Sequence, residues 1–300
     1  MIFTSPAKLN FSLNVGARRA DGYHELNSVF HLISLHDTLE LTPAADFTFT
    51  CDVDLGIPAD DNLIIRAARA MAELHERPLP ATHLHLSKRI PHGAGLGGGS
   101  SNAATTIYAL SRLWGVRPDS PDTLALAAEL GSDVPLFLAP TSASVMTGKG
   151  EQLAQSLSPV PDLSLVIVYP PGVHSSTGEV YRVFDTNPQP QCAQDALITE
   201  MQELSRQATV SDGRTPPISS LAALLYNNLE DAATSVAPET KAVLTWLRGN
   251  PLVAAALVAG SGSACWALCA AQADAGELAD AARSCGWWAQ EATTICARAV

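Results

Sequence analysis

The chain has 300 residues, 47% hydrophobic and 16% charged, which is the composition of a globular protein large enough for two hydrophobic cores. Its formal net charge of -12 argues against nucleic acid or an anionic membrane as a partner. No apolar run is long enough to span a membrane, and the N-terminus lacks the features of a signal peptide. Six scattered cysteines without a C-x-x-C pair favour reduced thiols, so we expect a cytoplasmic protein without a zinc site.

The first 60 residues are predicted to form mainly strands. Residues 1–15 alternate apolar and polar side chains, in a strand that Pro6 should interrupt. The Asp-Gly pair at 21–22 predicts a hairpin turn. Tyr23 and His24 follow it, and they either pair on the hairpin or present an aromatic ring and an imidazole to a ligand. Further strands are predicted at 29–35, 38–41 and 47–53.

A glycine-rich loop at 91–102 lies between a predicted strand at 83–90 and a helix whose apolar periodicity ends at Gly115. Backbone N–H groups at the start of that helix, together with its dipole, form a cradle for phosphate. The loop lacks the Gly-Lys-Ser/Thr ending of a Walker A motif. Asp119 lies in a proline turn, where a Rossmann fold would need the end of a strand. We therefore predict a phosphate-binding loop of another class rather than a flexible linker.

Two more helices are predicted beside this unit. Asn62 should cap a helix at 63–75, and the Ser-Pro pair at 120–121 should start another that ends near residue 131. Asp133 follows, before an apolar run at 134–138 that is typical of a strand. This residue is either a turn residue or a carboxylate placed for base chemistry. A hairpin with its turn at 147–150 completes the first half.

The proline-rich segment 157–161 is the predicted domain boundary, which divides the chain into residues 1–160 and residues 161–300. Residues 186–216 are polar and contain several prolines, and we expect low order there, with a possible helix at 199–207. Strands are predicted at 163–169, 252–258 and 287–295, helices at 178–184, 219–230, 239–247 and 271–285, and a glycine turn between two strands at 259–268.

Three separated motifs resemble those of the GHMP kinases. They are Pro6-Ala7-Lys8-Leu9-Asn10, the loop 91–102, and Gly260-Ser261-Gly262-Ser263. Further segments at 19–24, 61–63 and 133–135 resemble the branch of this family that phosphorylates the 2-hydroxyl of 4-diphosphocytidyl-2-C-methyl-D-erythritol with ATP, in the non-mevalonate isoprenoid pathway. The resemblance covers nearly all of the chain apart from residues 186–216.

This resemblance implies an α+β fold in two domains. The N-terminal domain would bind ATP and contain a left-handed β-α-β crossover, in contrast to the usual right-handed connection. The C-terminal domain would be smaller and ferredoxin-like, with the active site in the cleft between the two. ATP would bring Mg²⁺ with it, and because no glutamate can be assigned as a protein ligand, we assign no metal-binding residue.

The resemblance also implies site residues by position. Asp133 would be the catalytic base, with Lys8 beside it near the acceptor hydroxyl. Tyr23, His24 and Tyr181 would hold the cytosine, Asn10 would lie near the acceptor, and Thr177 would face the substrate. The implied ATP-binding residues are Asn62 and Lys88 near the adenine, with Pro91, Gly93, Gly95, Leu96, Gly97, Gly98, Gly99, Ser100 and Ser101 in the loop.

Two other classes of function stay open at this point. One is a different GHMP reaction, catalysed by another small-molecule kinase or by an ATP-dependent decarboxylase. The other is a non-catalytic nucleotide-binding module, against which the presence of both Lys8 and Asp133 argues. The expected partners are ATP and a small cytidine diphosphate-linked substrate, without nucleic acid or membrane, and the sequence does not predict an oligomeric state.

Overall fold

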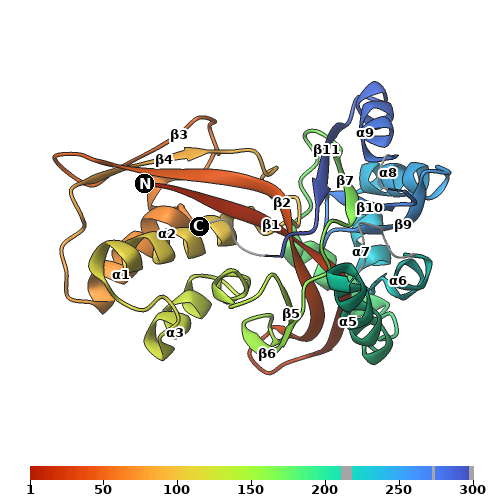
Figure 1. Cartoon of the computed structure of the whole chain (residues 1–300), viewed down its shortest axis with the longest axis horizontal. Coiled ribbons are helices and arrows are strands. Elements are labelled where there is room, and N and C mark those ends of the chain that lie inside the picture. The colour runs from red at the N-terminus through yellow and green to blue at the C-terminus, as the bar shows by residue number, and fades with distance from the viewer. Residues whose placement is uncertain (211–217, 272–273, 297–300) are drawn as a thin grey trace.

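The computed structural model describes residues 1–210, 218–271 and 274–296, and two long paired strands run through it from end to end of one half and into the other (Figure 1). β1 (Ile2–Arg18) and β2 (His24–Pro43) pair antiparallel, with the predicted turn at 21–22 between them. Pro6 does not end β1, because the pairing shifts register just after it and the strand continues. The two strands predicted at 29–35 and 38–41 are likewise one strand, which pairs with β1 on one side and, in two separate stretches, with β5 and β4 on the other.

The first sheet has the order β3-β4-β2-β1-β8, with β5 paired to β2 and β6 to β5. Helices α1, α2 and α3 pack below β1 and β2 as drawn in Figure 1, and their apolar sides form a buried cluster against the sheet. The bounds are β3 (Thr48–Cys51), α1 (Leu63–Leu74), β4 (Thr82–Ser87), α2 (Gly98–Trp114), α3 (Pro121–Leu130), β5 (Ala143–Gly148), β6 (Gln152–Leu157) and β8 (Tyr226–Asn227).

The caps predicted for these helices are confirmed. The Asn62 side chain accepts a hydrogen bond from the Ile64 N–H at the start of α1, and the Ser120 side chain caps α3 in the same way. α2 begins directly after the glycine loop and ends at Gly115, whose φ of 68° lies in the left-handed region that glycine tolerates.

The second sheet, of order β11-β7-β10-β9, forms the other half of the molecule. Its strands and helices follow one another as β7, helices, β9, β10, α9 and β11, the β-α-β-β-α-β succession of a ferredoxin-like unit. The bounds are β7 (Ser164–Tyr169), α4 (Thr177–Thr186), α5 (Asp195–Val210), α6 (Ser219–Leu224), α7 (Glu230–Val236), α8 (Pro238–Arg248), β9 (Val253–Val258), β10 (Cys265–Cys269), α9 (Asp274–Ser284) and β11 (Trp288–Thr293).

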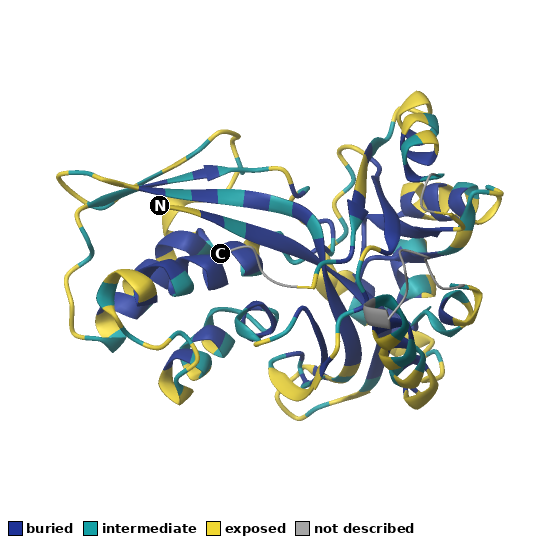
Figure 2. Cartoon of the chain, viewed as in Figure 1, coloured by how far each residue is buried: buried dark blue, intermediate teal, exposed yellow. Residues whose placement is uncertain are grey.

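One hydrophobic cluster continues from the first half into the second. Figure 2 shows buried residues where the first half meets the second. Phe11 of β1 stacks on Trp266 of β10, with ring centroids 5.5 Å apart and planes 17° apart, and both side chains are fully buried. The two halves therefore share one hydrophobic core. The boundary at residues 160 and 161 and the left-handed crossover stay predictions.

Two sequence-based predictions name the wrong secondary structure. The strand predicted at 134–138 is a short 3-10 helix, Pro135–Leu138, since a proline in the first turn suits a helix start. The helix predicted at 219–230 is divided into α6 and α7 by β8, because β8 pairs in parallel with Ser12 and Leu13 of β1. That tertiary pairing overrides the local helical pattern.

The low order expected at 186–216 is also wrong where the structure describes it. α5 extends over 195–210, beyond the helix predicted at 199–207, and buries Leu197, Met201 and Leu204. These residues have helical i, i+4, i+7 spacing, so one apolar stripe was enough to dock a mostly polar helix. Residues 211–216 lie outside the described part of the chain.

Candidate active site

A pocket of about 740 Å³ opens where the three motifs meet. It is lined by β1, the glycine loop, the segment after α3, the start of α4 and the turn between β9 and β10. The predicted site residues that line it are Lys8, Asn10, Tyr23, His24, Gly95, Gly97, Ser100, Asp133, Thr177 and Tyr181.

Backbone contacts hold the motifs together. The Lys8 N–H donates to the Leu96 carbonyl at 3.0 Å, and the Ala264 N–H donates to the Ala94 carbonyl at 3.2 Å. Gly95 has φ +81°, and a Cβ there would lie 1.9 Å from the Ala259 carbonyl oxygen. Only glycine fits this contact, so the glycine loop is held between β1 on one side and the turn 259–263 on the other.

Lys8 and Asp133 face each other in this pocket. The Lys8 side chain is 6% exposed, and its Nζ lies 3.7 Å from Asp133 Oδ2. Nζ also donates to Asn10 Oδ1 at 2.9 Å and lies 5.3 Å from the centre of the Phe30 ring. Burial lowers the pKa of Lys8, and the charge of Asp133 opposes that shift. The Asp133 side chain is 31% exposed, so its carboxylate can receive a proton from a ligand.

The phosphate cradle is formed by the first turn of α2. Gly97 is the N-cap in left-handed backbone geometry, with φ 72°, and the N–H groups of the first turn have no partner within the helix. An anion at this position would meet these donors and the positive end of the helix dipole. The Ser101 hydroxyl and the Asn102 side-chain oxygen are buried there without a hydrogen-bond partner.

Lys88 supports this loop from beneath instead of lining the pocket. Its Nζ donates to Asp37 Oδ2 at 2.8 Å and to the Ile90 carbonyl, and Asp37 is fully buried. The Asp37 carboxylate also accepts from the Arg89 and Ile90 N–H groups and from Asn102 Nδ2. This network fixes the end of β4 against α2, and sequence reasoning missed it because Asp37 lies inside a strand.

The opposite end of the pocket is aromatic. The His24 and Tyr181 rings lie 5.0 Å apart between centroids, and His24 Nε2 lies 2.7 Å from Asp185 Oδ1. Tyr23 is 54% exposed, and Lys149 Nζ lies 4.8 Å from the centre of its ring. Burial raises the pKa of Tyr181, and so does the charge of Asp133, so its hydroxyl stays neutral.

Sequence reasoning missed Asp185, Lys149 and Arg18 among the pocket residues. Asp185 follows Tyr181 by four residues on α4, which places both on one face of the helix and could have revealed it. Lys149 lies in a hairpin turn and Arg18 at the end of β1, and no local pattern marks either as a pocket residue.

Several predicted ATP-binding residues do not line this pocket. Leu96 and Ser101 are buried under the loop, Asn62 caps α1, and Lys88 is bound to Asp37. Their roles toward ATP, and a place near the adenine for two of them, stay predictions. The predicted residues outside the pocket lining are Asn62, Lys88, Pro91, Gly93, Leu96, Gly98, Gly99 and Ser101.

The oxygen atoms at the cradle suit a hard cation. Within the described residues no three His, Cys, Asp or Glu side chains come together as a metal site. Mg²⁺ is usually held by one or two protein oxygens together with phosphate oxygens of the nucleotide, and the unpartnered oxygens of Ser101 and Asn102 are of this kind. The residues therefore fit a metal that arrives with ATP. The described helices include none long and apolar enough to cross a membrane.

Two family models match the chain: "GHMP kinases N terminal domain" over residues 62–140 and "GHMP kinases C terminal" over residues 202–286. The chain is 37% identical to the 4-diphosphocytidyl-2-C-methyl-D-erythritol kinase of Salinispora arenicola, over 91% of this chain and 85% of that protein. It is 34% identical to the enzyme of that name from Caulobacter vibrioides, over 95% of this chain and 96% of the relative.

Solved structures agree with these relatives. A crystal structure of 4-(cytidine 5'-diphospho)-2C-methyl-D-erythritol kinase superposes with a TM-score of 0.76 at 34% identity, covering 98% of this chain and 99% of the other. A homoserine kinase from Cytophaga hutchinsonii superposes with a TM-score of 0.70 at 17% identity, covering 99% of this chain and 95% of the other. This similarity supports the fold alone.

Proposed function

Since the chain belongs to the GHMP kinases, and among them to the 4-diphosphocytidyl-2-C-methyl-D-erythritol kinases, we propose that it transfers the γ-phosphoryl group of ATP to the 2-hydroxyl of that cytidine-linked polyol, in the non-mevalonate isoprenoid pathway. The family, the two-domain α+β fold and the activity of an ATP-dependent kinase agree with the predictions from sequence. The observation that carries the proposal is a single pocket with a lysine–aspartate pair and a phosphate cradle at one end and an aromatic pair with a histidine at the other.

Asp133 would act as the general base at the transfer end. Its carboxylate takes the proton of the 2-hydroxyl while that oxygen forms a bond to the γ-phosphorus, and the bond from this phosphorus to the leaving ADP oxygen breaks. Lys8 stays buried beside Asp133 and the acceptor oxygen, where its positive charge offsets the negative charge of the reacting groups. Phosphoryl transfer depends mostly on such positioning and charge neutralisation.

The first turn of α2 would hold the phosphates of ATP. Ser100 of this turn and the N-cap Gly97 line the pocket, and Gly97 keeps the backbone open for close approach. Mg²⁺ on the nucleotide would supply charge neutralisation, with the oxygens of Ser101 and Asn102 as the described side-chain groups able to hold it.

His24 would read the edge of the cytosine. A carboxylate only accepts, so the short contact with Asp185 places a proton on Nε2, and in the tautomer with a single ring proton Nδ1 is then an acceptor. Cytosine carries an amino donor where uracil carries an oxygen acceptor, so an acceptor on His24 favours cytosine. Tyr23 and Tyr181 would stack on the base.

A transfer assay with labelled ATP and a panel of acceptors tests this proposal. The panel contains the cytidine-linked methylerythritol, its uridine analogue, free methylerythritol and homoserine. We expect strong labelling of the cytidine-linked acceptor, weak labelling of the uridine analogue and no labelling of free methylerythritol or homoserine. Transfer to another acceptor alone would indicate a different GHMP kinase, and ATP binding without any transfer would indicate a nucleotide-binding module. Action in the cytoplasm stays a prediction.

A further inference from the structure

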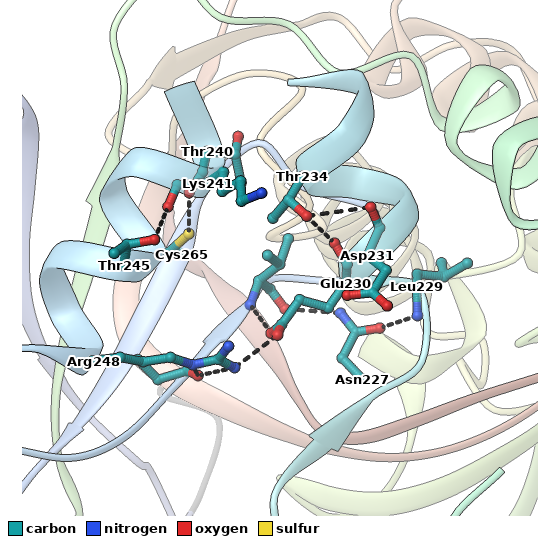
Figure 3. Close-up of polar contacts among 12 residues, drawn as sticks. Asn227, Leu229, Glu230, Asp231, Thr234, Thr240, Lys241, Thr245, Arg248 and Cys265 are labelled. Carbon is teal, nitrogen blue, oxygen red and sulfur yellow. Dashed lines mark hydrogen bonds and ion pairs between the residues drawn. The ribbon is translucent and has the colours of Figure 1, made fainter. Parts of the chain in front are cut away.

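The turn 259–263, which contains the third motif, has side-chain contacts at Gly260, Ser261 and Ser263, and the contact at Gly260 comes from Asn227. Asn227 (Figure 3) lies in β8 and donates from Nδ2 to the carbonyls of Val258, at 3.0 Å, and Gly260, at 2.8 Å. Its Oδ1 accepts from the Leu229 N–H at 2.9 Å. Both N–H groups and the oxygen of the side-chain amide are therefore hydrogen-bonded to the backbone, and the residue is 7% exposed.

Neighbouring residues support the same turn. Glu230 forms an ion pair with Arg248 at 2.7 Å (Figure 3) and accepts from the Val258 N–H at 3.4 Å. Thr240 donates to the Ser263 carbonyl at 3.0 Å. Of these residues, Asn227 is the one that contacts the carbonyl of Gly260, and Gly260 lines the pocket.

The front of the turn lies against the groups that would carry out the reaction. A Cβ at Gly260 would lie 3.4 Å from Lys8 Nζ, 3.4 Å from the Gly95 carbonyl oxygen and 3.7 Å from Asn10 Oδ1. The backbone there has φ +57°, and glycine can adopt many other backbone conformations. The position of Gly260 therefore depends on its contacts with neighbouring residues. A shift of this residue by a fraction of an ångström would change the packing around Lys8 and the glycine loop together.

We propose that Asn227 is a positioning residue for phosphoryl transfer, which acts through the carbonyls of Val258 and Gly260 to hold the turn 259–263 against Lys8 and the phosphate loop. β8 also pairs with β1 at Ser12 and Leu13, four or five residues after Lys8. One short strand thus ties β1 and the turn to each other, so Lys8 and Gly260 keep their spacing. This inference rests on the proposed kinase function, because it assigns Asn227 a part in that reaction.

The adjacent residue provides a matched control. Asn228 is 2% exposed, accepts from the Val15 N–H at 2.8 Å and donates to the carbonyls of Val15 and Gln189. It therefore makes as many backbone contacts as Asn227 but none to the turn. Asn227→Ala and Asn228→Ala should lower the melting temperature by similar amounts, because each removes the partner of several buried backbone groups.

The test compares kcat, KM and hydrogen exchange of both variants with those of the unaltered chain. A misplacement far from the chemistry can cost about 10²-fold in rate, so Asn227→Ala should lower kcat by about 10- to 100-fold with little change in KM. Asn228→Ala should keep kcat. Amide exchange in the peptide that contains residues 259–264 should accelerate in Asn227→Ala alone. Equal kcat and equal exchange of this peptide in the two variants would overturn the proposal.

Two further measurements keep the outcome clear. Asn227→Asp keeps the acceptor for Leu229 but removes both donors, so it covers the case in which Asn227→Ala does not fold, and it should show the same loss of kcat and faster exchange. Exchange is measured without substrate. If the unaltered chain phosphorylates no cytidine-linked acceptor, the proposed function fails, while faster exchange in the Asn227 variants still identifies the support of the turn.

Discussion

The two ends of the pocket are built in different ways. At the transfer end, Lys8 is almost fully buried and the walls are backbone: the glycine loop, the turn 259–263 and the first turn of α2. At the cytosine end, the walls are the side chains of Tyr23, His24 and Tyr181, and Tyr23 is 54% exposed. Backbone walls in close contact leave little room for a ligand to rearrange them, whereas an exposed ring can rotate. We therefore expect substitutions at the first end to affect turnover and those at the second to affect affinity and selectivity.

The largest effect is expected for Gly97→Val. A Cβ at Gly97 would lie 2.9 Å from the Phe137 ring and 3.0 Å from Lys8 Cγ, and φ there is +72°. ATP binding should be lost while the fold remains, as measured by calorimetry and circular dichroism. Gly115→Val is the control, because Gly115 at the other end of α2 has φ +68° with nothing within 4 Å. It has the same backbone strain and should bind ATP normally. Normal ATP affinity in a folded Gly97→Val variant would contradict the cradle.

Asp133→Asn should have the next largest effect. The change keeps the size of the side chain and removes its charge and its capacity as a base, which typically contributes about 10²–10⁴-fold. We expect kcat to fall by that factor while the Kd for ATP changes little, because the cradle is backbone. Steady-state kinetics and calorimetry measure the two quantities. Turnover at the rate of the unaltered chain would mean that Asp133 is a turn residue after α3 and not the catalytic base.

The pH dependence of turnover should report Lys8. Burial lowers the pKa of this lysine against the opposing charge of Asp133, so its proton is lost at a lower pH than that of an exposed lysine. Because the protonated form is the active one, kcat should fall as pH rises, by about tenfold for each pH unit above the apparent pKa. Lys8→Arg keeps its charge throughout this range and should remove the alkaline decline, although its absolute rate is lower. An alkaline decline that persists in Lys8→Arg would assign it to another group.

The residues of the site differ in how far the sequence could predict them. The glycine loop, Lys8 and Asp133 lie in short motifs with a physical reason for each residue, and all three meet in the pocket. Asp185, Lys149 and Asn227 act through partners that are far away in the chain, such as His24 or the carbonyl of Gly260. A local pattern contains no information on such pairs, so only the fold reveals them.

The same distinction explains the errors in the secondary structure. The termini of α1, α2 and α3 were predictable because caps are local: Asn62, Ser120 and Gly115 each act within a few residues. β8 was not, because Tyr226 and Asn227 form a strand only by pairing with β1, more than two hundred residues earlier. Long-range pairing decides the conformation of segments whose local preference is weak.

At the cytosine end, Tyr181→Ala should weaken the substrate and leave ATP unchanged. Stacking on an aromatic ring contributes about 1–3 kcal/mol per base, which corresponds to about one to two powers of ten in affinity. We expect the KM for the cytidine-linked substrate to rise by that factor, with the Kd for ATP as the internal control. Tyr181 also packs on His24, so the melting temperature is measured in parallel. A lower melting temperature with an unchanged KM would reduce Tyr181 to a structural role.

The smallest effect is expected for Lys149→Met, and its sign identifies the face of Tyr23 that meets the base. Lys149 Nζ lies over the Tyr23 ring, and an exposed cation–π contact contributes about 0.5–1 kcal/mol, or about two- to fivefold in affinity. If Lys149 covers the face of the ring that points away from the substrate, its loss frees an exposed tyrosine to rotate, and KM for the cytidine-linked substrate should rise by that factor. We expect this outcome, with Lys149→Arg close to the unaltered chain because the guanidinium stacks equally well. A fall in KM would instead mean that Lys149 occupies the stacking face in the free protein and must leave it before cytosine can bind.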